Sequence, residues 1–323
     1  MDHLTAIPEN LTSPLKVHTF GCKINLYDSG WVEKDLAKLN LKHKVHVLNT
    51  CAVTSEATKE AKRTIRRLKA QDPLCKVVVT GCAAQVDTDQ FDNLSGADLV
   101  VANSHKSQLR TIIEDFLNQK SSERVFKSNI FKKTDPESDG GLNEGRTRSF
   151  LKIQDGCNSF CTFCVIPFAR GQSRSLSIEA LVKKVNDLHF QGYQEVILTG
   201  VHIGDYFDDS KTSNNGLEDL VEALLEQTNI PRVRLSSLEP IEVTDRLLKL
   251  YLDDRMCKHF HMSIQSSHTD VLKHMKRKYT SEQVLESLEQ IQKTGLAPEW
   301  ESFSHGYSTT DRWLALVYKS LKK

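Results

Sequence analysis

A short loop with three cysteines constrains the fold of this chain more than any other feature of its sequence. In the run KIQDGCNSFCTFCVIPFARG, Cys157, Cys161 and Cys164 have the spacing Cys-x3-Cys-x2-Cys, directly after the apolar, strand-like residues 150–153. A cubane iron–sulfur cluster has four irons, so three thiolates leave one iron without a protein ligand. A small molecule with an amine and a carboxylate can bind that iron, whereas four-cysteine clusters typically only carry electrons. The spacing therefore predicts a catalytic cluster at the end of a strand.

The alternative for this loop is a zinc site. A structural zinc ion takes four ligands, usually cysteines and histidines at short spacing. The nearest histidines along the chain, His189 and His202, lie too far from the cysteines to belong to the loop. We therefore expect iron at this site.

Composition restricts the environment of the chain. Its 323 residues are enough for two domains, and 39% hydrophobic and 26% charged residues are ordinary for a globular protein. The first residues, MDHLTAIPEN, show no secretory signal, and no apolar run approaches the roughly 20 residues of a membrane span. Eight cysteines without an export signal favour metal binding in a reducing compartment. We expect a cytoplasmic protein, in which a net charge of only +1 leaves nucleic-acid binding to a local basic patch.

The pattern of residues 1–118 predicts an α/β domain. Short apolar, β-branched runs alternate with stretches of helical periodicity, which is typical of a doubly wound parallel sheet. The expected strands are 16–20, 44–48, 76–80 and 98–102, and the expected helices are 29–39, 56–69 and 87–94.

Three of these strands are followed by a cysteine, namely Cys22, Cys51 and Cys82. In an open parallel sheet the binding crevice lies outside the carboxyl ends of the strands, so these cysteines should converge in space. Each could be a buried structural thiol, since free cysteine is often buried, but three at equivalent strand ends favour a second three-cysteine cluster. Gly21 and Gly81 would let a bulky cluster approach the backbone.

The remaining two cysteines have no comparable arrangement. Cys75 precedes its strand and lies at the wrong end of the sheet, and Cys257 lies in the polar run DDRMCKHF. We expect both to be ordinary thiols.

A connecting segment at 119–147 and a second domain at 148–295 follow. The segment is rich in Ser, Lys, Asp, Glu and Gly and lacks helical periodicity. From residue 148 on, strands SFLKIQ, EVILTGV, VRLSSLE and HMSIQS alternate with expected helices 178–190, 217–226, 245–252 and 282–294. This succession predicts a partial βα barrel, whose chemistry is located at the carboxyl ends of its strands. The cluster loop follows the first strand, as that rule requires.

Further polar or small residues follow the later strands: Thr199, Gly200, Ser236, Glu239 and Gln265. Gly200 stands where a backbone must pass close to a ligand. The polar residues are either active-face groups or residues that cap turns and contact solvent.

Charged residues also surround the cluster loop. Arg277 either pairs with a carboxylate or phosphate or is a solvated charge at a helix end. Asp155, Arg170 and Arg174 flank the loop, and we expect them to brace it.

A basic stripe runs along the expected helix 58–69. Its residues Lys59, Lys62, Arg63, Arg66 and Arg67 share one helix face. Such a face can follow a phosphate backbone, but runs of charge are also common on solvated surfaces, so both interpretations stay open.

The order of these motifs resembles the methylthiotransferase family of radical S-adenosylmethionine enzymes. The resemblance is carried by FGCKINLYDS, NTCAVT and TGCAAQ, followed by QDGCNSFCTFCVIPFARGQSRS with the aromatic Phe163 before the last cysteine. It extends from about residue 16 to residue 296. The motifs QDGC and GCKIN are most similar to those of the branch that modifies threonylcarbamoyladenosine in tRNA. Other branches act on isopentenyladenosine in tRNA or on an aspartate of a ribosomal protein.

The resemblance implies a tRNA-modifying enzyme with two [4Fe–4S] clusters and S-adenosylmethionine as cofactors. The Cys157 loop would generate a 5'-deoxyadenosyl radical, and the Cys22, Cys51 and Cys82 set would carry sulfur. The product would be a methylthio group on adenine carbon-2, next to the anticodon. A flavodoxin-type electron donor and a monomeric state are implied as well. The cofactor would contact Phe163, Thr199, Gly200, Ser236, Glu239, Gln265 and Arg277.

The end of the chain departs from the family pattern. In the family, a further strand and a glycine-proline turn follow the helix that ends near Gly295, and a small RNA-binding barrel comes last. Here 296–323 contains EWESFSHGYSTTDRW, without a β-branched run, and 265–268 reads QSSH in place of the usual QSGS. We therefore expect a truncated member that lacks late barrel strands, with an amphipathic helix at 311–323. The alternative function is a catalytically inactive iron–sulfur protein that binds RNA or a partner.

Overall fold

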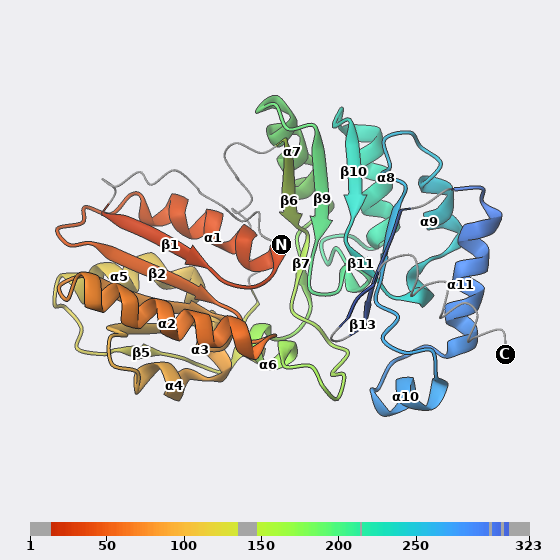
Figure 1. Cartoon of the computed structure of the whole chain (residues 1–323). Coiled ribbons are helices and arrows are strands. Elements are labelled where there is room, and N and C mark those ends of the chain that lie inside the picture. The colour runs from red at the N-terminus through yellow and green to blue at the C-terminus, as the bar shows by residue number, and fades with distance from the viewer. Residues whose placement is uncertain (1–13, 135–146, 214, 297–298, 305–306, 310–323) are drawn as a thin grey trace. The chain divides into compact units, whose positions relative to one another are not determined.

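The computed structural model describes residues 14–134, 147–213, 215–296, 299–304 and 307–309. It divides into two units, Met1–Asn129 and Ile130–Lys323, each with its own parallel strands (Figure 1). The division falls inside the segment 119–147 that the sequence predicted as a connection. In the described part of that segment, Val125–Phe126 forms strand β5 and Ile130–Lys132 forms the 3-10 turn η2, so the segment contributes structure to both units.

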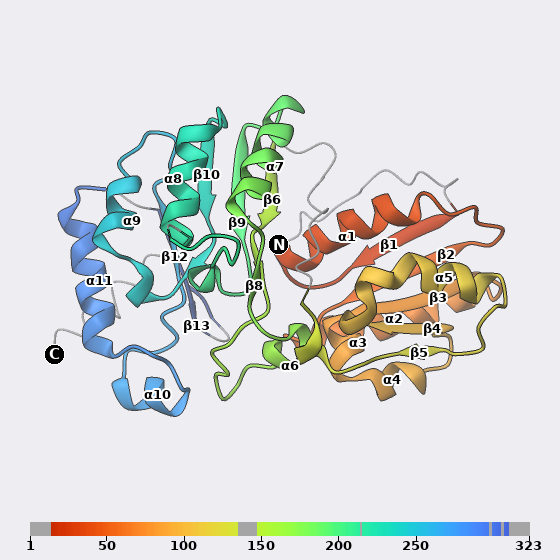
Figure 2. The same cartoon turned by 180° about the vertical axis from the view of Figure 1, so that it is seen from behind.

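The first unit is built on a five-stranded parallel sheet in the order β1-β2-β3-β4-β5. The strands before β5 are β1 (Leu15–Thr19), β2 (Val45–Thr50), β3 (Lys76–Gly81) and β4 (Leu99–Ala102). Between them run α1 (Lys23–Leu36), α2 (Ser55–Gln71), α3 (Cys82–Val86), α4 (Thr88–Asp92), the 3-10 helix η1 (Asn103–Gln108) and α5 (Leu109–Leu117) (Figure 2).

Both faces of this sheet are covered by helices. Successive side chains of a strand point to opposite faces, so neighbouring residues join different cores. Val47 and Val78 belong to one buried cluster with α1 and α5, whereas Leu48 and Val77 belong to another with α2, α3 and α4. This arrangement confirms the predicted doubly wound α/β domain, and the near-continuous apolar strands reflect burial on both sides.

Helix α1 begins at residue 23, whereas the sequence predicted a start at residue 29. Ile24 and Tyr27 are buried and give the first turns a core-facing side. Asn25, Asp28 and Ser29 are buried as well, although they are residue types that usually mark turns. Their side chains bond within the interior, which is why a propensity argument placed the helix start too late.

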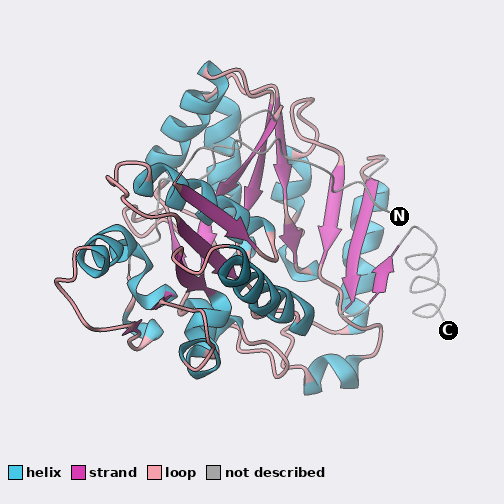
Figure 3. Ribbon diagram, turned by 60° about the vertical axis from the view of Figure 1, so that its left-hand side comes forward, coloured by secondary structure: helices cyan, strands magenta, loops and turns pink. Residues whose placement is uncertain are grey.

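The second unit is an open succession of parallel strands and helices (Figure 3). Strands β6 (Arg148–Lys152), β9 (Glu195–Thr199) and β10 (Arg232–Leu235) form one sheet in the order β10-β9-β6. After Ser236 the chain continues as β11 (Ser237–Leu238), which pairs with β12 (His259–Met262). The intervening helices are α7 (Ile178–Phe190), α8 (Leu217–Gln227), α9 (Asp245–Leu250) and α11 (Ser281–Lys293). This is the predicted partial βα barrel.

Shorter elements stand at the carboxyl ends of these strands. They are the ribbon of β7 (Gln154–Asp155) and β8 (Arg174–Ser175), helices α6 (Ile166–Arg170) and α10 (Thr269–His274), and the 3-10 turns η3 (Ile203–Asp205) and η4 (Pro240–Glu242). Among the residues described in both units, no helix is long and apolar enough to cross a bilayer.

A strand follows residue 295, contrary to the sequence prediction. Strand β13 (Glu299–Ser304) pairs in parallel with β12, and β14 (Tyr307–Thr309) pairs with β13 in antiparallel orientation. Backbone hydrogen bonds to an open strand edge do not require β-branched side chains, so the composition of EWESFS was a poor guide. The predicted loss of the strand beside β12 is therefore wrong, and the helix predicted at 311–323 lies outside the described residues.

Candidate functional site

The three-cysteine loop runs from β7 to α6, after the first parallel strand of the second unit. Its entry requires glycine. Gly156 has φ +78°, and a Cβ there would lie 1.9 Å from the carbonyl oxygen of Gln172. The amide of Cys157 donates to the carbonyl oxygen of Gly171 at 3.0 Å. The start of the loop is thus held tightly against the returning chain.

A buried carboxylate braces this loop, as the sequence predicted. Asp155 Oδ1 lies 2.9 Å from Arg170 Nη1 and accepts from the amide of Gly156 at 2.9 Å. Asp155 Oδ2 lies 3.5 Å from Arg174 Nη2 and 3.4 Å from Lys152 Nζ, a cation that the sequence analysis did not assign. All four charged side chains are almost fully buried. The directions of β6, β7 and α6 are therefore fixed around one acid.

The thiols of the loop are close enough to affect one another. Burial raises the pKa of Cys161 and of Cys164, and the neighbouring thiols raise both further. Burial alone would also raise the pKa of Cys157, but hydrogen bonds with His202 and Ser159 lower it. Thiolates are the metal-binding form, and adjacent thiolates in a partly buried site favour a cationic partner. The loop therefore fits a cluster held by three protein ligands.

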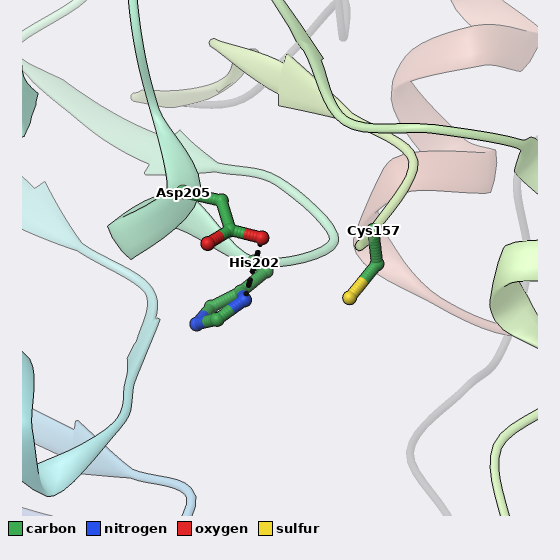
Figure 4. Close-up of side chains that lie close together, drawn as sticks. All are labelled: Cys157, His202 and Asp205. Atoms are coloured by element: carbon green, nitrogen blue, oxygen red, sulfur yellow. Dashed lines mark ion pairs between the residues drawn. The ribbon is translucent and has the colours of Figure 1, made fainter. Parts of the chain in front are cut away.

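His202 was predicted to lie away from this loop because it is distant along the chain. The structure instead places it beside Cys157. Cys157, His202 and Asp205 place one ligand atom each within 4.8 Å of one another (Figure 4). His202 Nδ1 lies 3.1 Å from Asp205 Oδ2, and Nε2 lies 2.5 Å from Glu242 Oε1. Burial alone would lower the pKa of His202, but hydrogen bonds with Asp205, Cys157 and Glu242 raise it to about 12.

With this raised pKa, His202 is protonated in the arrangement described. An imidazolium has a proton on both ring nitrogens and no lone pair for a metal. His202 is thus placed beside Cys157 as a hydrogen-bond donor, and iron in place of zinc stays a prediction for this loop.

Several of the predicted cofactor residues lie together. Arg277 forms an ion pair with Glu239, so it is bound to a carboxylate and is not a solvated helix-end charge. Its guanidinium carbon lies 5.8 Å from the ring centre of Phe163 and 6.0 Å from that of Tyr279. Glu239 Oε1 lies 3.8 Å from His202 Nε2. Burial raises the pKa of Glu239, although His202 and Arg277 lower it in part.

The other predicted cofactor residues lie at the ends of β9, β10 and β12. Thr199 is buried at the end of β9, and a Cβ on Gly200 would lie 2.9 Å from Gln154 Oε1. Ser236 is buried, and its hydroxyl has no hydrogen-bond partner within the described part of the chain. Gln265 has φ +64°, a left-handed conformation that costs free energy in a residue with a side chain.

Gln154 is a positioning residue that the sequence analysis missed. Its Nε2 donates to the carbonyl oxygen of Gly156 at 2.7 Å and to Ser173 Oγ at 2.8 Å. Its Oε1 accepts from the amide of His202 at 3.0 Å. Gln154 thus joins the cysteine loop to the end of β9. A polar residue in the strand directly before the cysteine motif was the available signal.

The second set of cysteines follows three neighbouring strands of the first unit: Cys22, Cys51 and Cys82. Cys22 is exposed, whereas Cys51 and Cys82 are buried. Asn25 connects these strand ends. Its Nδ2 donates to the carbonyl oxygens of Phe20 at 2.8 Å and Thr50 at 3.0 Å, and Cys82 Sγ lies 4.0 Å from its Oδ1.

The glycines beside these cysteines are required by the packing of the strand ends. A Cβ on Gly21, at φ +91°, would lie 2.5 Å from Cys51 Sγ. A Cβ on Gly81, at φ +96°, would lie 2.4 Å from the carbonyl oxygen of Thr50. Both positions need glycine because the adjacent strand end occupies that space, and the approach of a cluster to these glycines stays a prediction. The turn before Cys22 therefore lies directly against Cys51. The three cysteines follow neighbouring strands, and three sulfur donors at one edge of a sheet suit a shared metal group.

Cys75 and Cys257 are both buried away from these arrangements. Cys75 Sγ lies 3.9 Å from the carbonyl oxygen of Leu68, and Cys257 neighbours Glu195 and two arginines. Burial raises the pKa of each thiol. Cys75 precedes β3 and Cys257 precedes β12, so both stand at the strand ends opposite those that carry the two cysteine sets.

Each unit matches a known protein family. Residues 151–310 match the Radical SAM superfamily, and residues 15–102 match "Uncharacterized protein family UPF0004". The cysteine loop and the βα strands thus belong to a radical S-adenosylmethionine domain.

Curated proteins of similar sequence indicate the family within this superfamily. The chain is 35% identical over 285 residues to "Threonylcarbamoyladenosine tRNA methylthiotransferase MtaB" of Rickettsia prowazekii, covering 85% of this chain and 64% of that protein. For the proteins of the same description from Bacillus subtilis and Aquifex aeolicus, identity is 35% over 297 residues and 36% over 274. Those matches cover 87% and 82% of this chain and 64% and 66% of the relatives. The chain belongs to the methylthiotransferase family, in the MtaB branch, and spans slightly less than two thirds of the length of these relatives.

Solved structures share the fold at low identity. The radical S-adenosylmethionine methyltransferase TsrM from Kitasatospora setae, with cobalamin and a [4Fe–4S] cluster bound, has a TM-score of 0.64 and 14% identity, covering 88% of this chain and 63% of that chain. The cobalamin-dependent radical enzyme OxsB, with aqua-cobalamin bound, has a TM-score of 0.54 and 16% identity, covering 86% and 43%.

Proposed function

We propose that this chain adds a methylthio group to adenine carbon-2 of threonylcarbamoyladenosine in tRNA, next to the anticodon. The observation that carries the proposal is the presence of two separate three-cysteine sets, each at the carboxyl ends of parallel strands. A reaction that activates an aromatic C–H bond and also delivers sulfur has a use for both sets. The relatives of the MtaB branch support this choice of substrate.

Residues of the two sets would hold the clusters. Cys157, Cys161 and Cys164 would bind one [4Fe–4S] cluster, and the cysteines after β1, β2 and β3 would bind the other. Bound there, such clusters supply an electron for the reductive cleavage of S-adenosylmethionine at one site and a carrier for sulfur at the other. We assign the sulfur-carrying role to residues 1–118 and the radical-generating role to residues 148–295.

The charged side chains beside the first cysteine set are complementary to the amine and the carboxylate of S-adenosylmethionine. Its amine would be attracted by the carboxylates of Glu239 and Glu242, and its carboxylate by Arg277. Arg277 is already held by Glu239 and stands over the ring of Phe163, so it is oriented before the ligand binds. The unpaired hydroxyl of Ser236 offers a further donor at the same strand ends.

The basic face of α2 suits the RNA. Thr58 Oγ1 donates to the carbonyl oxygen of Cys51 at 3.0 Å, so the first turn of α2 is tied to the second cysteine set. Lys59 and Arg63 pair with glutamates of the same helix. Arg66 and Arg67 are exposed further along. We assign phosphate contacts to this face, and we expect a flavodoxin-type electron donor, a monomer and a cytoplasmic location.

The test is iron analysis after anaerobic reconstitution. Two clusters predict about eight irons per chain, and replacing Cys157, Cys161 and Cys164 by Ala should remove about half of them. Replacing Cys22, Cys51 and Cys82 should also remove about half.

The chain offers its own matched control. Cys75→Ala and Cys257→Ala change buried cysteines outside both sets and should leave the iron content unchanged. Zinc in place of iron, or full iron content in either triple variant, would contradict the proposal.

A further inference from the structure

The first unit contains a fully buried ion pair beside the second cysteine set. Lys106 Nζ lies 3.1 Å from Asp28 Oδ2, and the two side chains are 1% and 2% exposed. Lysine is almost never fully buried unless it is paired, and a buried pair is often no more stabilising than apolar residues of similar size. Because stability alone does not explain this pair, its location beside the cysteines indicates a role for it there. Asp28 lies in α1, which starts directly after Cys22, and Lys106 lies in η1, directly after β4.

The ammonium of Lys106 also binds the strand that carries Cys51. Lys106 Nζ donates to Asn49 Oδ1 at 3.2 Å, and Asn49 is fully buried in β2, two residues before Cys51. The side-chain nitrogen Nδ2 of Asn49 donates to the carbonyl oxygen of Asn25 at 2.9 Å and to Ser29 Oγ at 3.0 Å. Both ends of this amide are thus used, so its orientation is fixed by Lys106 on one side and by α1 on the other.

The same 3-10 helix contacts the third cysteine. Asn103, the first residue of η1, donates through Nδ2 to Cys82 Sγ at 3.7 Å. On the opposite side, Cys82 Sγ is 4.0 Å from Asn25 Oδ1. One segment after β4 therefore connects to all three strand ends, through Asp28 to the helix after Cys22, through Asn49 to Cys51, and directly to Cys82.

We propose that Lys106 is a positioning residue for the second iron–sulfur cluster, which acts by fixing the Asn49 amide and so holding the turns of Cys22 and Cys51 in register with Cys82. An apolar residue would fill the same space but could not donate to Asn49 Oδ1, so the amide would be held from the α1 side alone. This inference rests on the proposed function, since it concerns the cluster assigned to these cysteines.

The test compares three variants of the full chain after anaerobic reconstitution. Lys106→Met removes the bond to Asn49 and the ion pair. K106M/D28N removes the same bond but leaves no unpaired buried charge, so it separates positioning from a folding defect. Asp28→Asn keeps the donor to Asn49. We expect iron to fall from about eight to about four per chain in K106M/D28N. D28N leaves the ammonium of Lys106 buried without its anion and should lose stability, but it should keep more iron than K106M/D28N because Asn49 is still held.

Three further readouts make the result specific. Cleavage of S-adenosylmethionine should persist in K106M/D28N because the Cys157 set is intact, and far-UV circular dichroism should match the wild type. Ile113→Ala, a core change in α5 of the same unit, is the control for lost stability and should keep its iron. Electron paramagnetic resonance of the reduced protein should show one cluster signal lost in K106M/D28N.

Each outcome bears on a different claim. About eight irons in K106M/D28N would overturn the role of Lys106 and leave the two-cluster function standing. Only about four irons in the wild type, all at the Cys157 set, would overturn the second cluster itself and this inference with it. Equal iron loss in Ile113→Ala would show that any loss of stability empties the site, which also contradicts a positioning role.

Discussion

The acid at the base of the radical S-adenosylmethionine loop gives the sharpest stability prediction. Asp155→Asn preserves the shape of the side chain but removes its charge. Three cations lie within 2.9 to 3.5 Å of the Asp155 carboxylate, and all of these groups are almost fully buried. The change would therefore leave buried cations without their anion.

The expected cost follows from that burial. Removing one partner of a buried ion pair costs about 3–5 kcal/mol. The asparagine oxygen can still accept from the amide of Gly156, which retains about 1 kcal/mol, so we expect the lower end, about 3 kcal/mol. At 1.4 kcal/mol for each factor of ten, this corresponds to a roughly 100-fold larger equilibrium population of the locally open state around the loop.

Hydrogen exchange followed by mass spectrometry measures this opening. The amides of Ile153 and Leu176 are the reporters, because they donate to the carbonyl oxygens of Thr199 and Ile153. We expect both to lose protection in D155N, together with iron at the Cys157 set. Protection within threefold of the wild type would refute the argument that Asp155 compensates the buried cations.

The matched control is Glu195→Gln, at the opposite ends of the same strands. Glu195 also pairs with two arginines, but one of them has a side chain that is 56% exposed. Solvent screening reduces the worth of the pair with Arg232 to at most about 1 kcal/mol. The less exposed pair with Arg234 lies at the amino ends of the strands, away from the loop. E195Q should therefore change exchange near the loop very little and leave the iron in place.

Three further predictions follow from the same structure. Gly81→Ala would place a Cβ 2.4 Å from a backbone oxygen of β2, so it should destabilise the first unit by at least about 2 kcal/mol in urea denaturation. Replacing Lys62, Arg66 and Arg67 by Gln should weaken tRNA binding in fluorescence anisotropy and make its salt dependence shallower by about one for each lost phosphate contact, whereas Lys183→Gln should not. Burial alone would raise the pKa of Glu195, but hydrogen bonds from β10 arginines hold it below its ordinary value of 4.5. The stabilisation is full above that pH and is lost as the pH falls through the lower folded pKa, so wild type and E195Q should differ in stability at pH 7 and converge under acid.

The sequence was sufficient for the order of strands and for the six cysteines at strand ends. Apolar runs predicted the strands, and the carboxyl-end rule placed Cys22, Cys51 and Cys82 at one edge of the sheet. The bracing of the loop by Asp155 was also predictable, because unlike charges flank the cysteines within a few residues.

The remaining features depended on contacts between distant segments. His202 is 45 residues after Cys157 in the sequence, and only the parallel pairing of β6 with β9 brings the two ends together. Strand β13 exists because β12 offers an open edge, which its own composition does not reveal. Lys106 was not among the residues predicted from the sequence, since its burial depends on Asp28 and Asn49 from other elements.

The most direct test of the division between the two cysteine sets is one assay of both products. The variant with Cys22, Cys51 and Cys82 replaced by Ala is incubated anaerobically with reductant, S-adenosylmethionine and tRNA. Mass spectrometry then measures 5'-deoxyadenosine and methylthio nucleoside in the same sample. We predict that 5'-deoxyadenosine forms and the methylthio nucleoside does not. Methylthio product without the second set, or loss of 5'-deoxyadenosine while iron remains at the Cys157 set, would contradict the proposed separation of roles.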